Sequence, residues 1–452
     1  MRSRHWPLSW LIFHLCLTLP VPASEALPRL SLTQAVASAL EHHPSLKRLT
    51  EETEAAKAQE GVAVSGFLPQ ITLEALGKEG PSSAPGFGFS GLANSTIVQN
   101  AGASLVLEQL IFDFGRTLHR FRASRFTTAA ARAEQQAQQA LVTLTVYRAY
   151  YRALLAERLV QLAEQDLAAR EMLVKQAQAK AAAGLTSRVD VGLARTSLAE
   201  AQVGLIQARN ARQSAYAELN QAMGITGAPA YRLEEPPAAQ SPPALSPSLD
   251  QDVALALARR LEMGAAQSRI QAAGEKAQAA KAEGLPRLHA LGSVGYLNAP
   301  EEFGDDRIFA VGMGLTFPLF TGGRVQEQVA SARHEQGARR AAQDELAQGI
   351  RLEVIKARML LDALLQSQPA VAEQLTQARD SVKLATRRYH EGLGNILELQ
   401  QAQLSLLTAE NNTARLRYDL ITAQAALRYA LGILMAAPEP HTTPGNLEPK
   451  GE

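Results

Sequence analysis

The chain has 452 residues, enough for two or three ordinary domains, and a formal net charge of +1, which gives no indication of a nucleic-acid partner. Aromatic residues make up only 5% of the chain, while alanine is frequent. This composition disfavours a bulky globular core and favours helices that pack closely through small side chains.

Residues 1–23 predict a cleaved signal peptide. A positively charged start precedes a mainly apolar run, Leu8 to Leu19, and small residues stand ahead of a cleavage point after Ala23. The run is shorter than the roughly 20 residues of a membrane-spanning helix, although an uncleaved anchor is the alternative. The only cysteine, Cys16, lies in this run without small residues before it. We therefore expect no lipidation, and no disulfide or thiolate metal site after cleavage.

The rest of the chain predicts an internal duplication. Five pairs of segments match in order, first at an offset of 217 residues and then at an offset of 208. The pairs are Ser31–Val36 with Ser248–Val253, Leu68-Pro69 with Leu285-Pro286, Gly115-Arg116 with Gly323-Arg324, Gly184-Leu185 with Gly392-Leu393, and Met223–Ile225 with Leu431–Ile433. One loop change of nine residues explains both offsets at little cost. We expect a first repeat over 24–227 and a second over 248–434.

Each repeat predicts the same series of elements. These are an opening helix (31–66 and 250–284), a β-hairpin (about 68–113 and 286–320), a long helix (about 116–183 and 323–391) and a return helix (about 187–224 and 395–434). Apolar residues step by three and four along the helices, as in coiled coils. A helix over 116–183 would be roughly 100 Å long, so it must pack sideways on other helices. Pro369 is expected to kink the second long helix.

The opening and return helices together match one long helix in length, so we expect them to stack end to end beside it. The Pro-rich stretch 228–247 would lie where they meet, although a disordered linker between two domains is the alternative. Residues 435–452 form a C-terminal tail.

The strands predict a membrane-spanning sheet. From Val311 to Leu319, apolar residues alternate with Gly, Thr and Pro, and each strand is long enough to cross a bilayer when tilted. No segment after the signal peptide is apolar enough to be a membrane helix. Four strands cannot close a barrel, and an open edge cannot lie in lipid. Several copies must then share one barrel, and three copies give twelve strands. The alternative is a small soluble sheet covered by helices.

Together these features resemble the TolC-like outer-membrane efflux proteins over about residues 30–434. The motifs that carry the resemblance are the Leu-Pro before a strand, Ile111–Arg116 and Leu319–Arg324 at the start of each long helix, and the Gly-Leu turns. Thr321 departs from the pattern, since the first half has Asp113 there. The resemblance implies a mostly α homotrimer, with a periplasmic α-helical barrel, an equatorial collar from 228–247 and the tail, and a shared twelve-stranded β-barrel.

By the same resemblance, the protein is an outer-membrane exit duct of an efflux or type I secretion system. Its partners would be further copies of itself, a periplasmic adaptor, an inner-membrane transporter and outer-membrane lipid. The resemblance does not decide whether the transported substrate is a drug, a metal or a protein. The alternatives are a periplasmic adaptor, which predicts one helical hairpin between β-rich domains, and a structural coiled-coil protein of the envelope, which leaves the strand pairs unexplained.

The turns between antiparallel helices are candidate docking sites for the adaptor and the transporter. They comprise Gly184, Leu185, Thr186 and Ser187 in the first repeat, and Gly392, Leu393, Gly394 and Asn395 in the second. The alternative is that the glycines only provide left-handed helix caps.

A channel constriction is expected beyond the second turn. Glu398 matches a position where the family places an acidic ring, and three such side chains would repel one another and attract cations. The family's second acidic position is Gln401 here, which argues against a double ring. Asp190 is the equivalent of Glu398 in the first repeat. The alternative is an ordinary solvated carboxylate.

Nothing in the sequence supports catalysis or a cofactor. His42, His43 and His390 do not have the spacing of a metal site. The chain has no nucleophile elbow, no phosphate-binding loop and no dinucleotide fingerprint. We therefore expect no enzyme activity.

Overall fold

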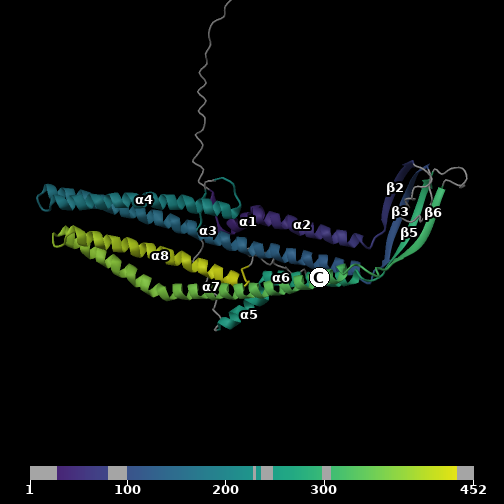
Figure 1. Cartoon of the computed structure of the whole chain (residues 1–452). Coiled ribbons are helices and arrows are strands. Elements are labelled where there is room, and N and C mark those ends of the chain that lie inside the picture. Colours follow the sequence, from purple (N-terminus) through teal and green to yellow (C-terminus); the bar gives the residue numbers. More distant parts are fainter. Residues whose placement is uncertain (1–27, 80–98, 228–230, 236–247, 298–306, 435–452) are drawn as a thin grey trace, which may run out of the picture.

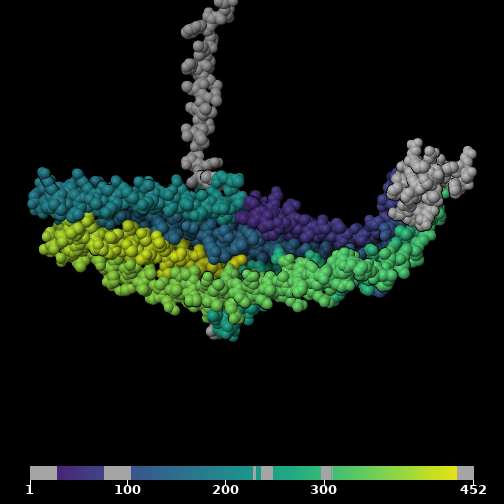
Figure 2. All heavy atoms as spheres, in the orientation of Figure 1, coloured from purple at the N-terminus to yellow at the C-terminus, as the bar shows by residue number. Residues whose placement is uncertain are grey.

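The computed structural model describes residues 28–79, 99–227, 231–235, 248–297 and 307–434. The expected signal peptide and C-terminal tail lie outside the described residues, as does most of the Pro-rich stretch. The molecule is a long rod of helices with a curved sheet at one end and two helical turns at the other (Figure 1). Figure 2 shows the first repeat lying along the second over most of this length.

The first repeat contains β1 (Arg29–Leu30), α1 (Leu32–His42), α2 (Pro44–Ser65), β2 (Gln70–Glu79), β3 (Gln99–Phe112), α3 (Arg116–Ala182) and α4 (Arg188–Met223). After β4 (Arg232–Leu233), the second contains α5 (Leu249–Arg259), α6 (Leu261–Ala282), β5 (Arg287–Leu297), β6 (Arg307–Thr316), α7 (Arg324–His390) and α8 (Ile396–Ala430). Among the described residues, no helix combines the length and the apolar character that a membrane span requires.

The opening helix of each repeat is two helices, which corrects the single helix expected over 31–66 and 250–284. The chain is extended at His43 (φ −66°, ψ 124°) and at Arg260 (φ −65°, ψ 121°). In the first repeat Pro44 explains the break, because proline disfavours helical geometry in the residue before it and suits the first position of a helix. The second repeat has the same break without a proline.

The return helices end against these breaks. Gly224 and Gly432 end α4 and α8 with left-handed geometry, at φ 72° and 69°. A Cβ on Gly224 would lie 2.8 Å from the His42 carbonyl oxygen, and one on Gly432 would lie 3.0 Å from the Arg259 carbonyl carbon. Close backbone contact therefore fixes where the short helices meet, halfway along α3 and α7.

A tyrosine ties the long helix α3 to the chain segments at this level. Tyr150 is fully buried, and its hydroxyl lies 2.8 Å from the Leu30 carbonyl oxygen and 2.6 Å from that of Glu234. Those carbonyls belong to β1 and to the residue after β4, which pair as short parallel strands. The α3 core is thus joined to the one described part of the Pro-rich stretch.

The four longer strands form an antiparallel sheet in the order β2-β3-β5-β6. The row Leu73, Leu105, Val294 and Phe309 runs straight across it, and all four side chains are exposed. On the opposite face Ser104, Val106 and Ser293 are buried, although no helix packs on the described sheet. The sheet is curved (Figure 1), and the face that carries these buried side chains is called the concave face below.

The convex face is almost entirely apolar. It presents Ile71, Leu73, Leu105, Leu107, Val294, Tyr296, Phe309, Val311, Met313 and Leu315, all exposed. The strand expected over Val311 to Leu319 ends sooner, at Thr316. Pro318 follows, and a proline cannot donate a hydrogen bond to a neighbouring strand.

The second long helix continues through its proline. α7 is helical from Arg324 to His390 with Pro369 inside it. Figure 1 shows α7 bending along its length.

Candidate functional site

The two turns that sequence analysis singles out lie side by side at the end of the rod farthest from the sheet (Figure 1). Gly184 and Gly392 have left-handed geometry, at φ 72° and 77°. The Leu185 N–H donates to the Lys180 carbonyl at 2.9 Å, and the Leu393 N–H donates to the Arg388 carbonyl at 2.8 Å. These are matching helix C-caps, so both glycines have a conformational role.

The next helix in each hairpin begins with a side-chain cap. The Asp190 N–H donates to the Ser187 hydroxyl at 3.3 Å, and the Glu398 N–H donates to the Asn395 side-chain oxygen at 2.8 Å. The Asp190 carboxylate also accepts a hydrogen bond from the Thr186 hydroxyl. Ser187, Asn395 and Asp190 are therefore used in forming the turns.

Each turn also exposes a pair of apolar side chains one helical turn apart. Leu185 is 76% exposed and Val189 is 69% exposed. Their equivalents in the second repeat, Leu393 and Leu397, are 69% and 54% exposed. Capping does not require these side chains, so the end of the rod carries apolar surface that nothing in the described chain covers.

Glu398 is not an isolated carboxylate. Its Oε1 lies 3.0 Å from Nε of Arg388, and Arg388 also donates to the Leu393 carbonyl at 3.2 Å. Both side chains of the ion pair are a little under half exposed. Gln401 is exposed on α8 three residues further on. The charge that Glu398 would bring to a constriction is thus opposed by a neighbouring cation.

Two contacts join the first hairpin to the second at this end. The Lys180 ammonium donates to the Tyr389 carbonyl and lies 4.0 Å from the centre of the Tyr389 ring. The Gln400 amide donates to the Leu193 carbonyl at 3.1 Å. Burial, and then the nearby charge of Asp190, raise the pKa of Tyr389.

A small core lies beneath these contacts and unites the four helices of the two hairpins. It consists of Leu173, Val174, Ala177, Ala194, Ala385, Tyr389, Ile396 and Leu399. The sequence analysis does not single out Lys180, Arg388 or Tyr389. The duplication holds the signal that could have found the first two, because Lys180 and Arg388 occupy equivalent positions four residues before the turn glycines.

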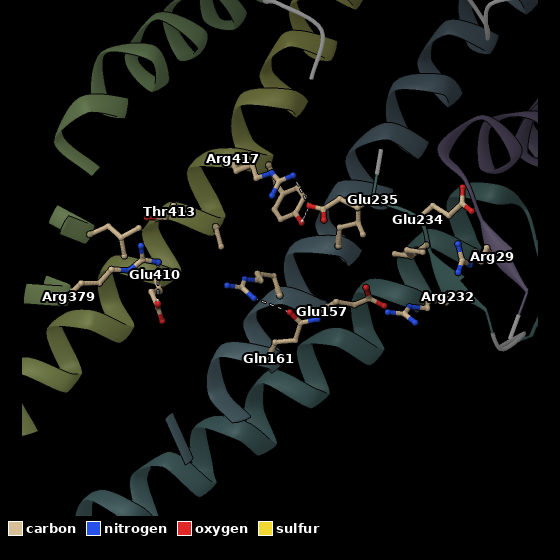
Figure 3. A pocket seen from close by; sticks show the side chains of 16 residues that line it. Arg29, Glu157, Gln161, Arg232, Glu234, Glu235, Arg379, Glu410, Thr413 and Arg417 are labelled. Carbon is tan, nitrogen blue, oxygen red and sulfur yellow. Dashed lines mark hydrogen bonds and ion pairs between the residues drawn. The ribbon is translucent and has the colours of Figure 1, made fainter. Parts of the chain in front are cut away.

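A separate cleft of about 660 Å³ lies halfway along the rod, between α3 and α8 beside β4. It is lined mainly by charged side chains, several of which pair across it. Figure 3 shows Arg417 and Glu235 directed at one another, at 2.8 Å, and Arg379 lies 3.8 Å from Glu410. We assign no ligand to a cleft whose charges oppose one another in this way.

The described residues contain no group of three or more His, Cys, Asp or Glu side chains that could hold a metal ion. His43 instead begins α2, where its Nδ1 lies 3.3 Å from the Ser45 N–H nitrogen. His390 is the last residue of α7.

The family model of outer membrane efflux proteins matches the chain twice, over residues 35–225 and 253–433. The chain belongs to the outer membrane efflux protein family. Protein CyaE of Bordetella pertussis is 29% identical over 434 residues, which cover 92% of this chain and 86% of CyaE. The alkaline protease secretion protein AprF of Pseudomonas aeruginosa is 26% identical over 422 residues, covering 88% of this chain and 83% of AprF.

This outer membrane efflux protein also shares its fold with crystallised channels. The outer membrane protein VceC of Vibrio cholerae has a TM-score of 0.77 at 23% identity, over 89% of this chain and 96% of VceC. The predicted fold class, duplicated helical hairpins with a β-barrel part, is confirmed by this likeness, and the family confirms the predicted outer-membrane location.

Proposed function

We propose that three copies of this outer membrane efflux protein form a passive duct through which substrates leave the cell. The observation that carries this proposal is the sheet, which is apolar on its convex face and has β2 and β6 at its edges. Within the described residues each of these two strands pairs on one side only. In lipid, every unpaired backbone group would cost several kcal/mol, so both edges need a partner.

Pairing β6 of one copy with β2 of the next satisfies both edges at once. Four strands are too few to close a barrel, whereas three copies supply twelve, enough for an open lumen. The concave face then lines the lumen and the convex face meets the acyl chains. The alternation of faces along each strand is the pattern that a barrel in a membrane requires.

The duplication supports a matching closure of the helices. α3 of the first repeat packs along α6 and α8 of the second. α7, the equivalent of α3, makes no comparable contact with α2 or α4 of its own copy within the described residues. Packing α7 against α2 and α4 of the next copy repeats the internal interface and closes a helical barrel.

We further propose that the two turns dock on a periplasmic adaptor and, with it, on an inner-membrane transporter that supplies the energy. Leu185, Val189, Leu393 and Leu397 provide the apolar contact surface, since large exposed apolar side chains that gather at one place mark interaction sites. Glu398, Gln401 and Asp190 would line the entrance beside them. The family match and the apolar sheet face favour this duct over an adaptor or a structural coiled coil.

The proposal is tested by measuring mass and conductance on the purified protein. We expect a trimer by native mass measurement and discrete single-channel currents in planar lipid bilayers. A monomer that produces no channels at any protein concentration would disprove the proposed duct. For the docking surface, the double substitution Leu185→Glu and Leu393→Glu should abolish transport in cells while leaving bilayer currents intact.

A further inference from the structure

A second cluster of charges lies where the sheet meets the helices, at the opposite end of the rod from the turns. Arg287 is the first residue of β5, and it lies on the concave face because its neighbour Leu288 and every second residue after it share the convex face. Its partner across β6 is Thr316, which carries no charge. The described residues offer the Arg287 side chain no hydrogen bond and no ion pair.

Two more arginines lie at the start of α3, which follows Phe112, the residue that pairs with Leu288 next to Arg287. Burial lowers the pKa of Arg116, and repulsion from Arg120 and Arg287 lowers it further, against the smaller opposing effects of Asp113 and Glu283. The Nε of Arg116 is buried without a hydrogen-bond partner, and the Asp113 carboxylate is 3.8 Å from it. A buried donor that is left unpaired destabilises the fold, so a bound acceptor would relieve that cost.

The nearby carboxylates are already occupied. Asp113 Oδ1 accepts from the Gly115 N–H at 3.1 Å, and Oδ2 accepts from the Thr117 N–H at 2.8 Å and the Thr117 hydroxyl at 2.6 Å. Glu283 accepts Arg120 on Oε1 at 2.8 Å and Arg324 on Oε2 at 3.1 Å. Both carboxylates are thus held by closer donors, and their nearest approach to the two remaining arginines is the 3.8 Å ion pair between Asp113 and Arg116.

The acidic residues on the same concave face are too far away to help. Glu74 lies opposite Ser104, which pairs with Gly295, eight residues along β5 from Arg287. Glu108 is paired across the sheet with Leu291, four residues along β5 from Arg287. At about 3.3 Å per residue the separation along the strand is roughly 13 Å. His289 lies nearer, over Gly314, and adds no negative charge.

We propose that Arg116 and Arg287, with the paired Arg120 beside them, form an oxyanion site on the lumen side of this junction, which takes carboxylate or phosphate groups of the passing cargo. The inference rests on the proposed duct, because only the shared barrel makes the concave face a lumen. Guanidinium groups suit such ligands, since each presents several fixed N–H donors to two oxygens at once. In a trimer the site occurs three times around one axis and favours anionic over cationic cargo.

The test uses the full-length trimer in a neutral detergent, with inorganic pyrophosphate as the probe. Thermal unfolding is followed by circular dichroism at constant ionic strength, with sodium chloride replacing pyrophosphate in the reference. Ligand that binds only the folded state raises the melting temperature in a saturable way. We expect saturable stabilisation of the wild-type protein. For Arg287→Gln, the pyrophosphate concentration that gives half of the maximal stabilisation should be roughly tenfold higher.

Two controls make the result specific. Arg287→Lys keeps the charge and should retain most of the binding. Arg152→Gln removes an exposed arginine that pairs with Glu218 elsewhere, and it should leave the midpoint unchanged. The site is disproved if the wild type shows no saturable shift, or if Arg287→Gln shows the same one.

A second experiment with lipid distinguishes the two possible sources of the anion, a lipid headgroup and the cargo. If phosphatidylglycerol stabilises the wild type but not Arg287→Gln, while pyrophosphate does nothing, the arginines bind headgroups and the lumen assignment is wrong. Bilayer currents test the duct itself. A variant that conducts normally but no longer responds to pyrophosphate upholds both proposals, whereas absent currents with intact pyrophosphate binding would overturn the duct alone.

Discussion

The two repeats begin their long helices with the same backbone and different chemistry. At the position before the helix-capping glycine, Phe114 has φ 54° and its equivalent Gly322 has φ 62°. Left-handed geometry costs a non-glycine residue roughly 1–2 kcal/mol, and glycine almost nothing. The first repeat offsets this cost with Asp113, whose buried carboxylate accepts three hydrogen bonds from the start of α3.

The second repeat has Thr321 in place of Asp113. A single threonine hydroxyl cannot reproduce the two carboxylate oxygens with which Asp113 accepts these hydrogen bonds. With Gly322 beside it, the turn needs no compensation. The departure from the family motif at Thr321 is therefore one half of a paired change. The comparison teaches that a repeated shape can be kept by residues that compensate for one another.

The largest difference between the repeats should appear when this capping residue is removed. Asp113→Ala leaves three donors unsatisfied at the start of α3, and we expect a loss of about 3 kcal/mol in the free energy of unfolding. Thr321→Ala should cost less than about 0.5 kcal/mol. Chemical denaturation of the trimer in detergent measures both. Equal losses in the two variants would show that Asp113 does not compensate for Phe114.

The next difference concerns alkaline pH, because buried tyrosines gather at mid-height on α3 of the first repeat, where Tyr151 contacts Tyr418 of α8 in the second. Burial raises the pKa of Tyr151 and of Tyr418, which packs on it, to about 12 in each case. The fold therefore favours the neutral phenols. Their contribution is present in full below pH 10 and is lost as pH rises from about 10 to about 12.

We expect about 2 kcal/mol of stability to disappear over that interval for each tyrosine. The position equivalent to Tyr151 in the second repeat is Met359, which does not titrate. Melting temperatures of Tyr151→Phe and Tyr418→Phe, measured from pH 8 to pH 12, should fall less steeply than those of the wild type. Parallel curves would show that these phenols are not responsible for the alkaline loss.

A third difference involves one basic position used in two ways. Lys180 reaches across to Tyr389 of the other hairpin, whereas its equivalent Arg388 pairs with Glu398 within its own hairpin. Lys180→Met should weaken the link between the hairpins by about 1–2 kcal/mol, and the tip should open more often. Single-channel recording should then show more frequent openings. The double substitution of Arg152 and Glu218 to Gln removes an ion pair away from the tip, and it should leave the opening frequency unchanged.

Much of the fold follows from local patterns in the sequence. Steps of three and four predict the long helices, alternation in residues such as Val311 and Met313 predicts the strands, and the two offsets predict the duplication. Both breaks in the opening helices were missed: Pro44 marks the first and was overlooked, whereas no proline marks the second, at Arg260. Each break lies against a return-helix glycine, Gly224 or Gly432, that is far away in the sequence.

The chemistry of the candidate site was harder to predict than its place. Glycine spacing located both turns, since a left-handed cap leaves a local signal. The Arg388–Glu398 pair and the contact of Lys180 with Tyr389 depend on which side chains meet across turns and hairpins. The spacing of residues in a single sequence does not show which side chains come into contact in this way. The sequence therefore predicts Glu398 as a carboxylate without a neighbouring cation.

The smallest effect on stability, and the sharpest on ion flow, concerns that ion pair. Partly exposed pairs contribute at most about 1 kcal/mol, so neither Arg388→Gln nor Glu398→Gln should disturb the fold. If both side chains line the entrance, Arg388→Gln should raise the preference for cations, and Glu398→Gln should lower it. The double variant should return close to the wild type, because it removes one charge of each sign. Reversal potentials in a potassium chloride gradient measure the ion preference of the wild type, the two single variants and the double variant. Four equal values would show that Glu398 is an ordinary solvated carboxylate.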